Sequence, residues 1–349
     1  MKIALIAPPY IAVPPKRYGG TELFISELVL GLQKRGVESI VYTNGASTIG
    51  VPRKFLYEKE DWPVRDEVEA NLKGINHSAW AILDAQSEAD IIHLNSAPGL
   101  ALQRFSNLPF VYTVHHSYEE PLTRFYSQFP DVSYVTISDF QRETLKLRRI
   151  RTIHHGIDMS KYCFHPKKEL YLSFLGRIAP VKAPHLAIEI AQKSGIPLKL
   201  AGEIQPLYRD YWERIVKPHV DGKFIEYVGS VGLEEKSELV GKSLAMLFPI
   251  QWDEPFGLVM IEAMACGTPV LALSGGSVAE VVKEGVSGYI GRSVDELAQR
   301  AANLDLQPES VRAYAQEYFS SERMAGDYID LYSEILDSRA ASQAEPIVA

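Results

Sequence analysis

One stretch of the sequence decides the fold: Glu254-Pro255-Phe256-Gly257-Leu258-Val259-Met260-Ile261-Glu262-Ala263-Met264-Ala265-Cys266-Gly267-Thr268-Pro269-Val270. Pro255 cannot continue a helix that has already formed, so Glu254 is expected in a loop and the helix is expected to begin near Gly257. Gly267 is expected to end that helix, because glycine readily adopts the left-handed conformation that follows a helix C-terminus. The stretch therefore predicts a loop, a helix and then a strand.

The same stretch carries two carboxylates, one before the helix and one inside it. Glu262 lies one turn after Leu258, so its side chain and the first helix amides share a face. The amides of Leu258 and Val259 carry the positive end of the helix dipole and suit an anion such as phosphate. A phosphate on these amides, ribose hydroxyls on Glu262 and a sugar on Glu254 would together make a nucleotide-sugar site. The spacing also fits a buried helix with two surface acids. The residues around this stretch are therefore needed to choose between that structural role and a nucleotide-sugar site.

Composition sets the broad class. A chain of 349 residues exceeds what one hydrophobic core usually supports, so two domains are expected. The hydrophobic content of 46% and the charged content of 23% are those of an ordinary globular protein. A net charge of −8 argues against nucleic acid as the main partner. No apolar run has the length of a signal peptide or a membrane span, so a cytoplasmic location is expected.

One local charge cluster departs from this average. The run Lys146-Leu147-Arg148-Arg149-Ile150-Arg151 is strongly basic. It fits either a solvated helix end or a weak contact with a membrane surface. The two cysteines, Cys163 and Cys266, cannot form a disulfide framework.

Short apolar strands alternate with helical patterns in both halves of the chain, which is typical of parallel α/β sheets. Strands are expected at 2–7, 39–43, 91–94, 110–115 and 134–138, and again at 171–175, 198–201, 223–227, 244–248 and 269–273. Thr21 is expected to cap the first helix. We expect an N-terminal domain at 1–160, a polar linker around 159–168 and a C-terminal domain at 169–320. A long last helix at about 321–339 follows the second sheet, and 340–349 are expected to be disordered.

Ligands of open α/β sheets bind at the carboxyl ends of the strands, so binding residues are expected in the loops there. Gly19-Gly20 opens a helix after the first strand, where glycine lets a ligand approach the backbone. His115 ends the strand at 110–115 and could donate a hydrogen bond to a sugar hydroxyl. Arg177 and Lys182 follow the strand at 171–175 and could hold a diphosphate. Each of these residues alone also has an ordinary structural explanation.

Two histidine pairs and a glycine loop also lie at the ends of expected strands. The pairs His115-His116 and His154-His155 lack the spacing and carboxylates of a known metal motif, so no metal site is expected. Ser274-Gly275-Gly276-Ser277 follows another strand and could line the same cleft as Arg177.

Together these residues resemble a retaining glycosyltransferase of the GT-B type, in family 4. The resemblance rests on Gly19-Gly20, the Thr-x-His ending at His115, the turn Gly156-Ile157-Asp158, the Gly-Arg-x4-Lys from Gly176 to Lys182, and residues 254–269. It implies an α/β GT-B fold of two Rossmann-like domains, with parallel sheets facing a central cleft. The donor would lie mainly on the C-terminal domain and the acceptor on the N-terminal one, with the last helix crossing back to the first domain.

The resemblance also implies roles for individual residues. Arg177 and Lys182 would hold the donor diphosphate and stabilise the leaving group. Glu262 would bind ribose, and His115 would touch the transferred sugar. Sugar and phosphate would bind to Glu254 and to the backbone of Phe256, Gly257, Leu258 and Val259, while Gly19 and Gly20 would approach the phosphates. In the family an asparagine usually precedes the Gly-Ile-Asp turn, where this chain has His155.

The function expected from these residues is hexosyl transfer. A hexose would move, with retention, from a nucleoside-diphosphate sugar to a hydroxyl of a saccharide, a lipid-linked glycan or a small molecule. No metal and no cofactor are expected, because a cationic phosphate seat can stabilise the departing diphosphate. A UDP-sugar is favoured over a GDP-sugar, and the acceptor is expected near the loops at 9–18 and 117–129. The alternatives are a nucleotide-sugar epimerase on the same fold and a catalytically silent sugar-nucleotide binding module.

Overall fold

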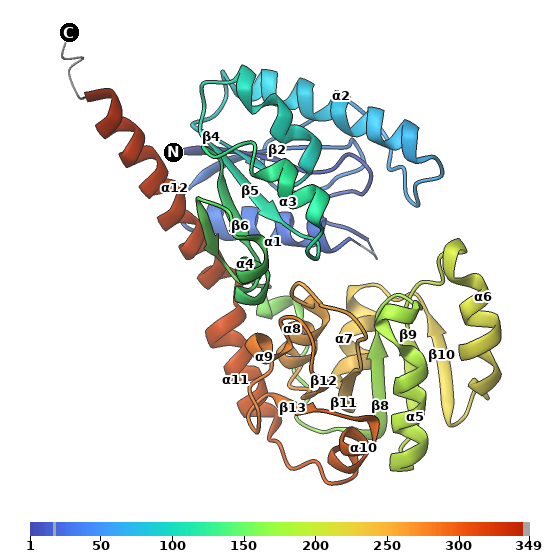
Figure 1. Cartoon of the computed structure of the whole chain (residues 1–349). Coiled ribbons are helices and arrows are strands. Elements are labelled where there is room, and N and C mark those ends of the chain that lie inside the picture. The colour runs from blue at the N-terminus through green and yellow to red at the C-terminus, as the bar shows by residue number, and fades with distance from the viewer. Residues whose placement is uncertain (17–18, 345–349) are drawn as a thin grey trace. The chain divides into compact units, whose positions relative to one another are not determined.

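The computed structural model describes residues 1–16 and 19–344 of the chain, which divide into two compact units (Figure 1). The N-terminal unit comprises Met1–Gly156 together with the C-terminal segment from Ser321, and the C-terminal unit comprises Ile157–Ser320. Each unit has its own parallel sheet. No helix in the described part is both long and apolar enough to cross a bilayer.

The N-terminal unit is built on a seven-stranded sheet in the order β3-β2-β1-β4-β5-β6-β7. Its strands are β1 (Lys2–Ile6), β2 (Glu38–Thr43), β3 (Arg53–Phe55), β4 (Ile91–Leu94), β5 (Phe110–Val114), β6 (Ser133–Thr136) and β7 (Ile150–Thr152). Its helices are α1 (Gly20–Lys34), α2 (Glu67–Ala85), a 3-10 helix (Ala97–Phe105), α3 (Glu120–Tyr126), α4 (Asp139–Leu145) and α12 (Ser321–Ala344). The central strands are buried on both faces, which explains why their residues are mostly apolar.

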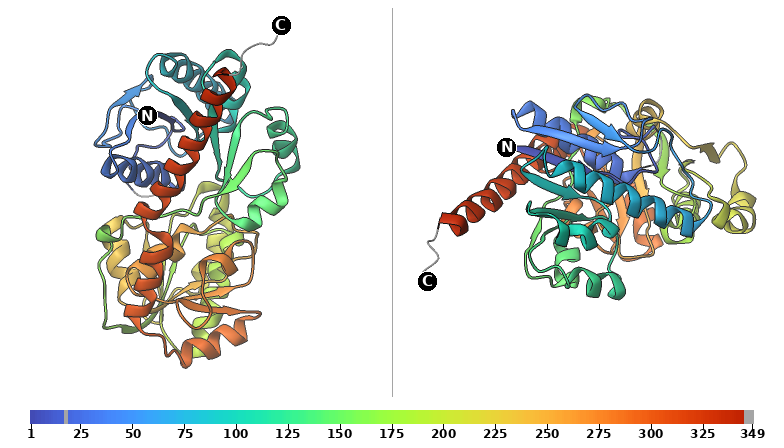
Figure 2. Two further views of the ribbon diagram at one scale, coloured as in Figure 1. Left: turned by 90° about the vertical axis from the view of Figure 1, so that its left-hand side faces the viewer. Right: turned by 90° about the horizontal axis from the view of Figure 1, so that it is seen from above.

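The last helix, α12, packs against α1 and joins the core of the N-terminal unit (Figure 2). Tyr328 and Tyr332 are fully buried and reach the sheet. The hydroxyl of Tyr332 lies 2.7 Å from Nδ1 of His93, and the hydroxyl of Tyr328 lies 2.8 Å from Oγ1 of Thr113. Buried polar atoms that are all paired in this way hold the helix in one register.

The C-terminal unit has a six-stranded sheet in the order β10-β9-β8-β11-β12-β13. Its strands are β8 (Glu169–Leu175), β9 (Leu198–Ala201), β10 (Ile225–Gly229), β11 (Ser243–Phe248), β12 (Val270–Leu273) and β13 (Gly288–Gly291). The helices are α5 (Pro184–Ser194), α6 (Arg209–Tyr211), α7 (Leu233–Gly241), α8 (Leu258–Ala265), α9 (Val278–Val281), α10 (Val294–Ala302) and α11 (Pro308–Phe319). Short 3-10 helices (Met159–Lys161, Pro180–Lys182, Pro206–Tyr208, Lys217–His219) and a π-helical turn (Trp212–Val216) complete it. Two Rossmann-like parallel α/β units confirm the expected fold class.

Several local expectations need correction. The expected linker is packed, because Arg312 donates hydrogen bonds to the carbonyls of Met159 and Tyr162 in the C-terminal unit. Thr21 is not the cap of α1, since Gly19, at φ 147°, is the residue that precedes the helix. The expected disorder is wrong for residues 340–344, which continue α12 as far as Ala344. Residues 17, 18 and 345–349 lie outside the described part.

Candidate functional site

The N-terminus of α8 is shaped by one glycine. Gly257 has φ 84°, and a Cβ there would lie 2.7 Å from Cε of Met260 and 3.0 Å from Cζ of Phe248. Both facts restrict the position to glycine. The amide of Met260 donates to the carbonyl of Gly257 at 2.9 Å, so the amides of Leu258 and Val259 precede the first turn's hydrogen bonds. The C-terminal unit therefore has the helix terminus expected for an anion site.

Two of the predicted residues, Lys182 and Glu254, lie in direct contact. The Nζ atom of Lys182 contacts Oε2 of Glu254, and both side chains are largely buried, with exposed fractions of 17% and 9%. The indole of Trp252 supports the pair, because its Nε1 donates to the same Oε2 at 2.8 Å and its ring centroid lies 4.6 Å from Nζ of Lys182. The structure thus combines a cation, a carboxylate and an aromatic face.

The glycine loop after β12, residues 274–277, holds the backbone on which Glu254 of the Lys182–Glu254 pair is carried. The amide of Ser277 donates to the carbonyl of Glu254 at 3.0 Å, and its hydroxyl donates to the carbonyl of Phe256 at 2.9 Å. A Cβ at Gly276 would lie 2.3 Å from the Glu254 carbonyl oxygen, so only glycine lets the two loops approach this closely. The loop at 274–277 therefore positions the backbone on which Glu254 sits.

Glu262 is buried and is held by two partners that the sequence did not indicate. Its Oε1 contacts Nζ of Lys236 on α7 and accepts a hydrogen bond of 3.0 Å from the hydroxyl of Tyr162. Both partners lie far from Glu262 in the sequence, and neither belongs to a recognisable motif. A carboxylate aligned by a cation and a hydroxyl suits hydrogen bonding to hydroxyl groups.

Arg177 occupies the loop after β8, as expected. Its Nη1 lies 3.5 Å from Oε1 of Gln205, in the loop after β9, whereas the partner of Lys182 is Glu254. The two predicted diphosphate ligands therefore have different partners within the C-terminal unit.

In the N-terminal unit, His115 is oriented by Asn95. The amide nitrogen of Asn95 donates to the carbonyl of Ile6 at 3.3 Å, so its Oδ1 faces Nε2 of His115 at 2.9 Å. Nε2 must then carry the ring proton, because an amide oxygen only accepts. Burial, together with His155, His93 and His116, lowers the pKa of His115 well below its usual value.

This geometry changes the role expected of His115. The ring is neutral and its Nε2 already donates to Asn95, so Nδ1 is the atom left with a lone pair. His115 can therefore accept a hydrogen bond from a hydroxyl through Nδ1. The sequence predicts the opposite direction, with His115 as the donor.

His155, the residue that departs from the family pattern, packs on His115. The two rings are stacked with centroids 5.7 Å apart, and Phe24 lies 4.9 Å from each of them. Burial lowers the pKa of His155 to about 3, so its ring is also neutral at physiological pH. His155 and Phe24 thus pack against the ring of His115 and restrict its orientation.

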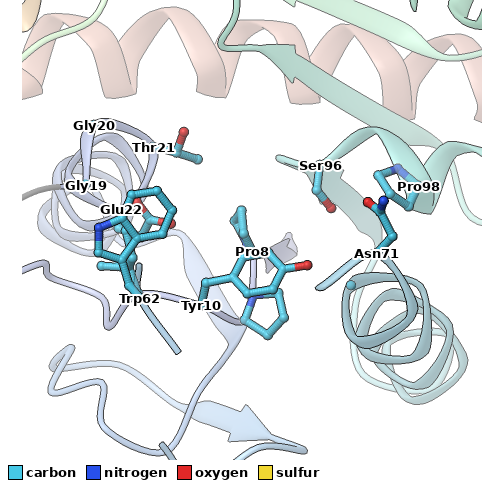
Figure 3. Close-up of a pocket in the computed structure, with 13 residues that line it drawn as sticks. Pro8, Tyr10, Gly19, Gly20, Thr21, Glu22, Trp62, Asn71, Ser96 and Pro98 are labelled. Carbon is cyan, nitrogen blue, oxygen red and sulfur yellow. The ribbon is translucent and has the colours of Figure 1, made fainter. Parts of the chain in front are cut away.

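Gly19 and Gly20 line a pocket of about 370 Å³ in the N-terminal unit. Figure 3 shows Glu22 and Trp62 on one side of it and Asn71 on the other, with Tyr10 between them. The pocket is also lined by Pro8, Pro9, Ile11, Thr21, Gly74, Ser96 and Pro98. Burial raises the pKa of Glu22 to about 7. Aromatic rings beside a carboxyl and an amide are groups that suit a polyhydroxyl ligand.

Solved structures resemble this fold over nearly the whole chain. AviGT4, a glycosyltransferase involved in avilamycin A biosynthesis, has a TM-score of 0.74 and is 24% identical, with 97% of this chain and 98% of that chain covered. Anabaena Alr3699/HepE, solved in complex with UDP and glucose, has a TM-score of 0.76 and is 18% identical, with 96% and 100% covered.

Curated relatives are similar at the same level of identity. D-inositol 3-phosphate glycosyltransferase of Mycolicibacterium smegmatis is 24% identical, with 94% of this chain and 89% of the relative covered. Spore coat protein SA of Bacillus subtilis is 23% identical, with 96% and 100% covered.

Two family models divide the chain between them. The model for glycosyl transferases group 1 matches residues 160–318, and the model for Glycosyltransferase Family 4 matches residues 18–161. Together they span residues 18–318, which include all the predicted site residues. The chain therefore belongs to the family 4 glycosyltransferases of the GT-B type, and it is an enzyme of that class.

Proposed function

We propose that the enzyme transfers a hexose from a nucleoside-diphosphate sugar to a hydroxyl acceptor, with retention of configuration and without a metal. The observation that carries this proposal is the buried contact between Lys182, in the segment between β8 and α5, and Glu254, in the loop that leads to the N-terminus of α8. A cation there suits the charge of a departing diphosphate, and the carboxylate suits the hydroxyls of the sugar.

The donor is proposed to bind through the C-terminal unit. Arg177, Lys182 and the amides of Leu258 and Val259 hold the diphosphate, and Glu262 accepts hydrogen bonds from ribose hydroxyls. Glu254 and the backbone of Phe256 and Gly257 bind the sugar. Because HepE was solved with UDP and with UDP-glucose, we favour a UDP-sugar over a GDP-sugar.

The chemistry requires stabilisation of the negative charge that develops on the leaving diphosphate. Lys182 and Arg177 supply fixed positive charge, and preformed donors of this kind need no reorganisation during reaction. In our proposal these two cationic side chains take the place of a divalent metal. The acceptor hydroxyl attacks from the leaving-group face, and the departing phosphate oxygen takes its proton, so no covalent enzyme intermediate forms.

The N-terminal unit is proposed to contact the reacting sugar and the acceptor. His115 accepts a hydrogen bond from a hydroxyl of the transferred sugar through Nδ1, and Gly19-Gly20 approaches the phosphates. The acceptor binds in the pocket lined by Tyr10, Glu22 and Trp62, where the indole and phenol rings offer flat apolar faces to it.

The test is product analysis with a panel of α-linked UDP- and GDP-sugars and simple glycosides, with and without EDTA. We expect one donor to give an α-linked product by NMR, at a rate that EDTA does not change. A β-linked product would overturn retention, and loss of activity in EDTA would overturn metal independence. Donor turnover to an epimer without acceptor would favour an epimerase, and absence of both transfer and donor hydrolysis would favour a silent binding module.

A further inference from the structure

We propose that Cys163, His165 and Glu238 form a binding site for a transition-metal ion, best suited to Zn²⁺. The three residues lie in the C-terminal unit, and their ligand atoms are all within 4.8 Å of one another. None of them belongs to the residues proposed above for hexosyl transfer. A thiol, an imidazole and a carboxylate are the ligand types that Zn²⁺ uses in proteins.

The backbone fixes Cys163 and His165 beside α7. The amide of Cys163 donates to Oγ of Ser237 at 2.8 Å, and the amide of His165 donates to the carbonyl of Cys266 at 3.2 Å. Phe164, between them, packs on Gly267, where a Cβ would lie 2.6 Å from its ring. Phe164 is thus anchored against Gly267. Its two neighbours, Cys163 and His165, place their side chains beside Glu238.

A glycine on α7 makes room for the imidazole. A Cβ at Gly241 would lie 2.3 Å from Cδ2 and 3.1 Å from Nε2 of His165, so only glycine lets the ring lie against this helix. Nε2 is buried and makes no hydrogen bond within the described residues, although Oε1 of Glu238 is 3.2 Å away. Buried polar atoms are normally satisfied, and a metal ion would satisfy this one.

The two oxygens of Glu238 are divided between two partners. Oε2 lies 2.7 Å from Nζ of Lys242, whereas Oε1 faces His165. Oε1 can therefore ligate a metal while Lys242 holds the other oxygen, as outer-shell partners of metal ligands commonly do.

The ligands must come slightly closer together than they are in this structure. Zn–S and Zn–N bonds of about 2.0–2.3 Å require ligand atoms roughly 3.5 Å apart in a tetrahedral site. Cys163 and Glu238 are exposed, so rotations of their side chains can bring them to the more fixed ring of His165. Three protein ligands leave the fourth position to water.

The chain offers a direct test, because it contains two cysteines that differ in reactivity. Cys266 is buried, and burial raises the pKa of its thiol to about 11, so a disulfide reagent modifies exposed Cys163 first. We expect one equivalent of Zn²⁺ to slow this modification by about tenfold or more, since a metal-bound thiolate is a poor nucleophile. Co²⁺ should give a thiolate charge-transfer band.

Variants distinguish metal binding by all three side chains from metal binding by the Cys163 thiol alone. His165→Gln, Glu238→Gln and Gly241→Ala should abolish both the protection and the Co²⁺ band. The matched controls His219→Gln and Glu234→Gln, at exposed positions of the same unit, should retain both. Modification of Cys163 at the same rate with and without Zn²⁺ would overturn the proposal, and so would protection that persists in the His165 and Glu238 variants.

Discussion

Lys182 and Glu254 stand 72 residues apart in the sequence, yet the ammonium of one contacts the carboxylate of the other against the indole of Trp252. Both charges are largely withdrawn from water, so each depends on the other for compensation. Removal of one partner leaves a buried charge, which costs more than removal of the pair. The cation proposed for the leaving group and the carboxylate proposed for the sugar therefore act as one unit.

Lys182→Met is expected to lower kcat by about 10²–10³, because it removes a preformed charge opposite the developing anion. Glu254→Gln should also lower kcat, and the double variant should lose less than the product of the two single losses. Steady-state kinetics with saturating donor measure all three effects. Strictly multiplicative losses would mean that the two residues act independently.

Glu262→Gln is expected to weaken nucleoside-diphosphate binding by about 10- to 100-fold, since hydrogen bonds to a charged group are worth roughly 1.5–3 kcal/mol. Tyr162→Phe keeps the carboxylate and its contact with Lys236, so it should weaken binding less. Titration calorimetry gives both affinities, and a thermal melt of each variant without ligand checks its folding. An unchanged affinity in Glu262→Gln would remove the ribose assignment.

The parts of the site that sequence could predict are those written in local patterns. Pro255, Gly257 and Gly267 fix where α8 begins and ends, because their backbone preferences act within a few residues. Lys236 and Tyr162 reach Glu262 only through tertiary packing. No pattern in the residues around Lys236 indicates that its side chain pairs with Glu262. The role of His115 likewise depends on the hydrogen bonds of Asn95, which no spacing reveals.

A pH dependence of stability follows from the buried histidines. His93 and His155 have pKa values of about 3 in the folded protein, lowered by burial, against about 6.5 in an unfolded chain. Between these values the unfolded state binds more protons, so the free energy of unfolding falls as pH drops below about 6.5. Each histidine contributes up to about 1.4 kcal/mol per pH unit.

His155→Asn should therefore flatten this dependence. Between pH 7 and 5.5 we expect its loss of unfolding free energy to be smaller than that of the wild type by about 1 kcal/mol. Urea unfolding at both pH values measures it, with His219→Gln, at an exposed position, as the control that should match the wild type. Equal losses in His155→Asn and the wild type would show that His155 takes up a proton in the folded state.

The contact between α1 and α12 gives a prediction about packing. A Cβ at Gly31 would lie 2.7 Å from Cβ of Ala325 and 3.0 Å from the carbonyl oxygen of Ser321. Gly31→Ala should lower the unfolding free energy by about 1–3 kcal/mol through overpacking, despite the better helix propensity of alanine. Gly326→Ala, whose Cβ would meet only Arg35 at 3.5 Å, should be neutral or stabilising. Thermal melts compare the two, and a Gly31→Ala variant as stable as the wild type would contradict this packing.

The fold was predictable where hydrophobic runs were long. The central strands of both sheets, such as β1 and β8, lie within two residues of their expected bounds because burial on both faces demands continuous apolar residues. The short strands β3, β7 and β13 were missed, since each sits at a sheet edge where burial makes fewer demands on its residues. The last turn of α12 was also missed, because residues 340–342 are polar or small and largely exposed.

The most direct measurement for the central claim is titration of the enzyme with UDP, GDP, ADP and dTDP in EDTA, by calorimetry and by thermal shift. At a ligand concentration about 100-fold above the dissociation constant, binding to the native state adds about 2.7 kcal/mol of stability. We predict that one nucleotide, with UDP favoured, binds without a metal and that Glu262→Gln weakens its binding. Failure of every nucleotide to bind, or binding that requires a divalent ion, would contradict the proposed donor site.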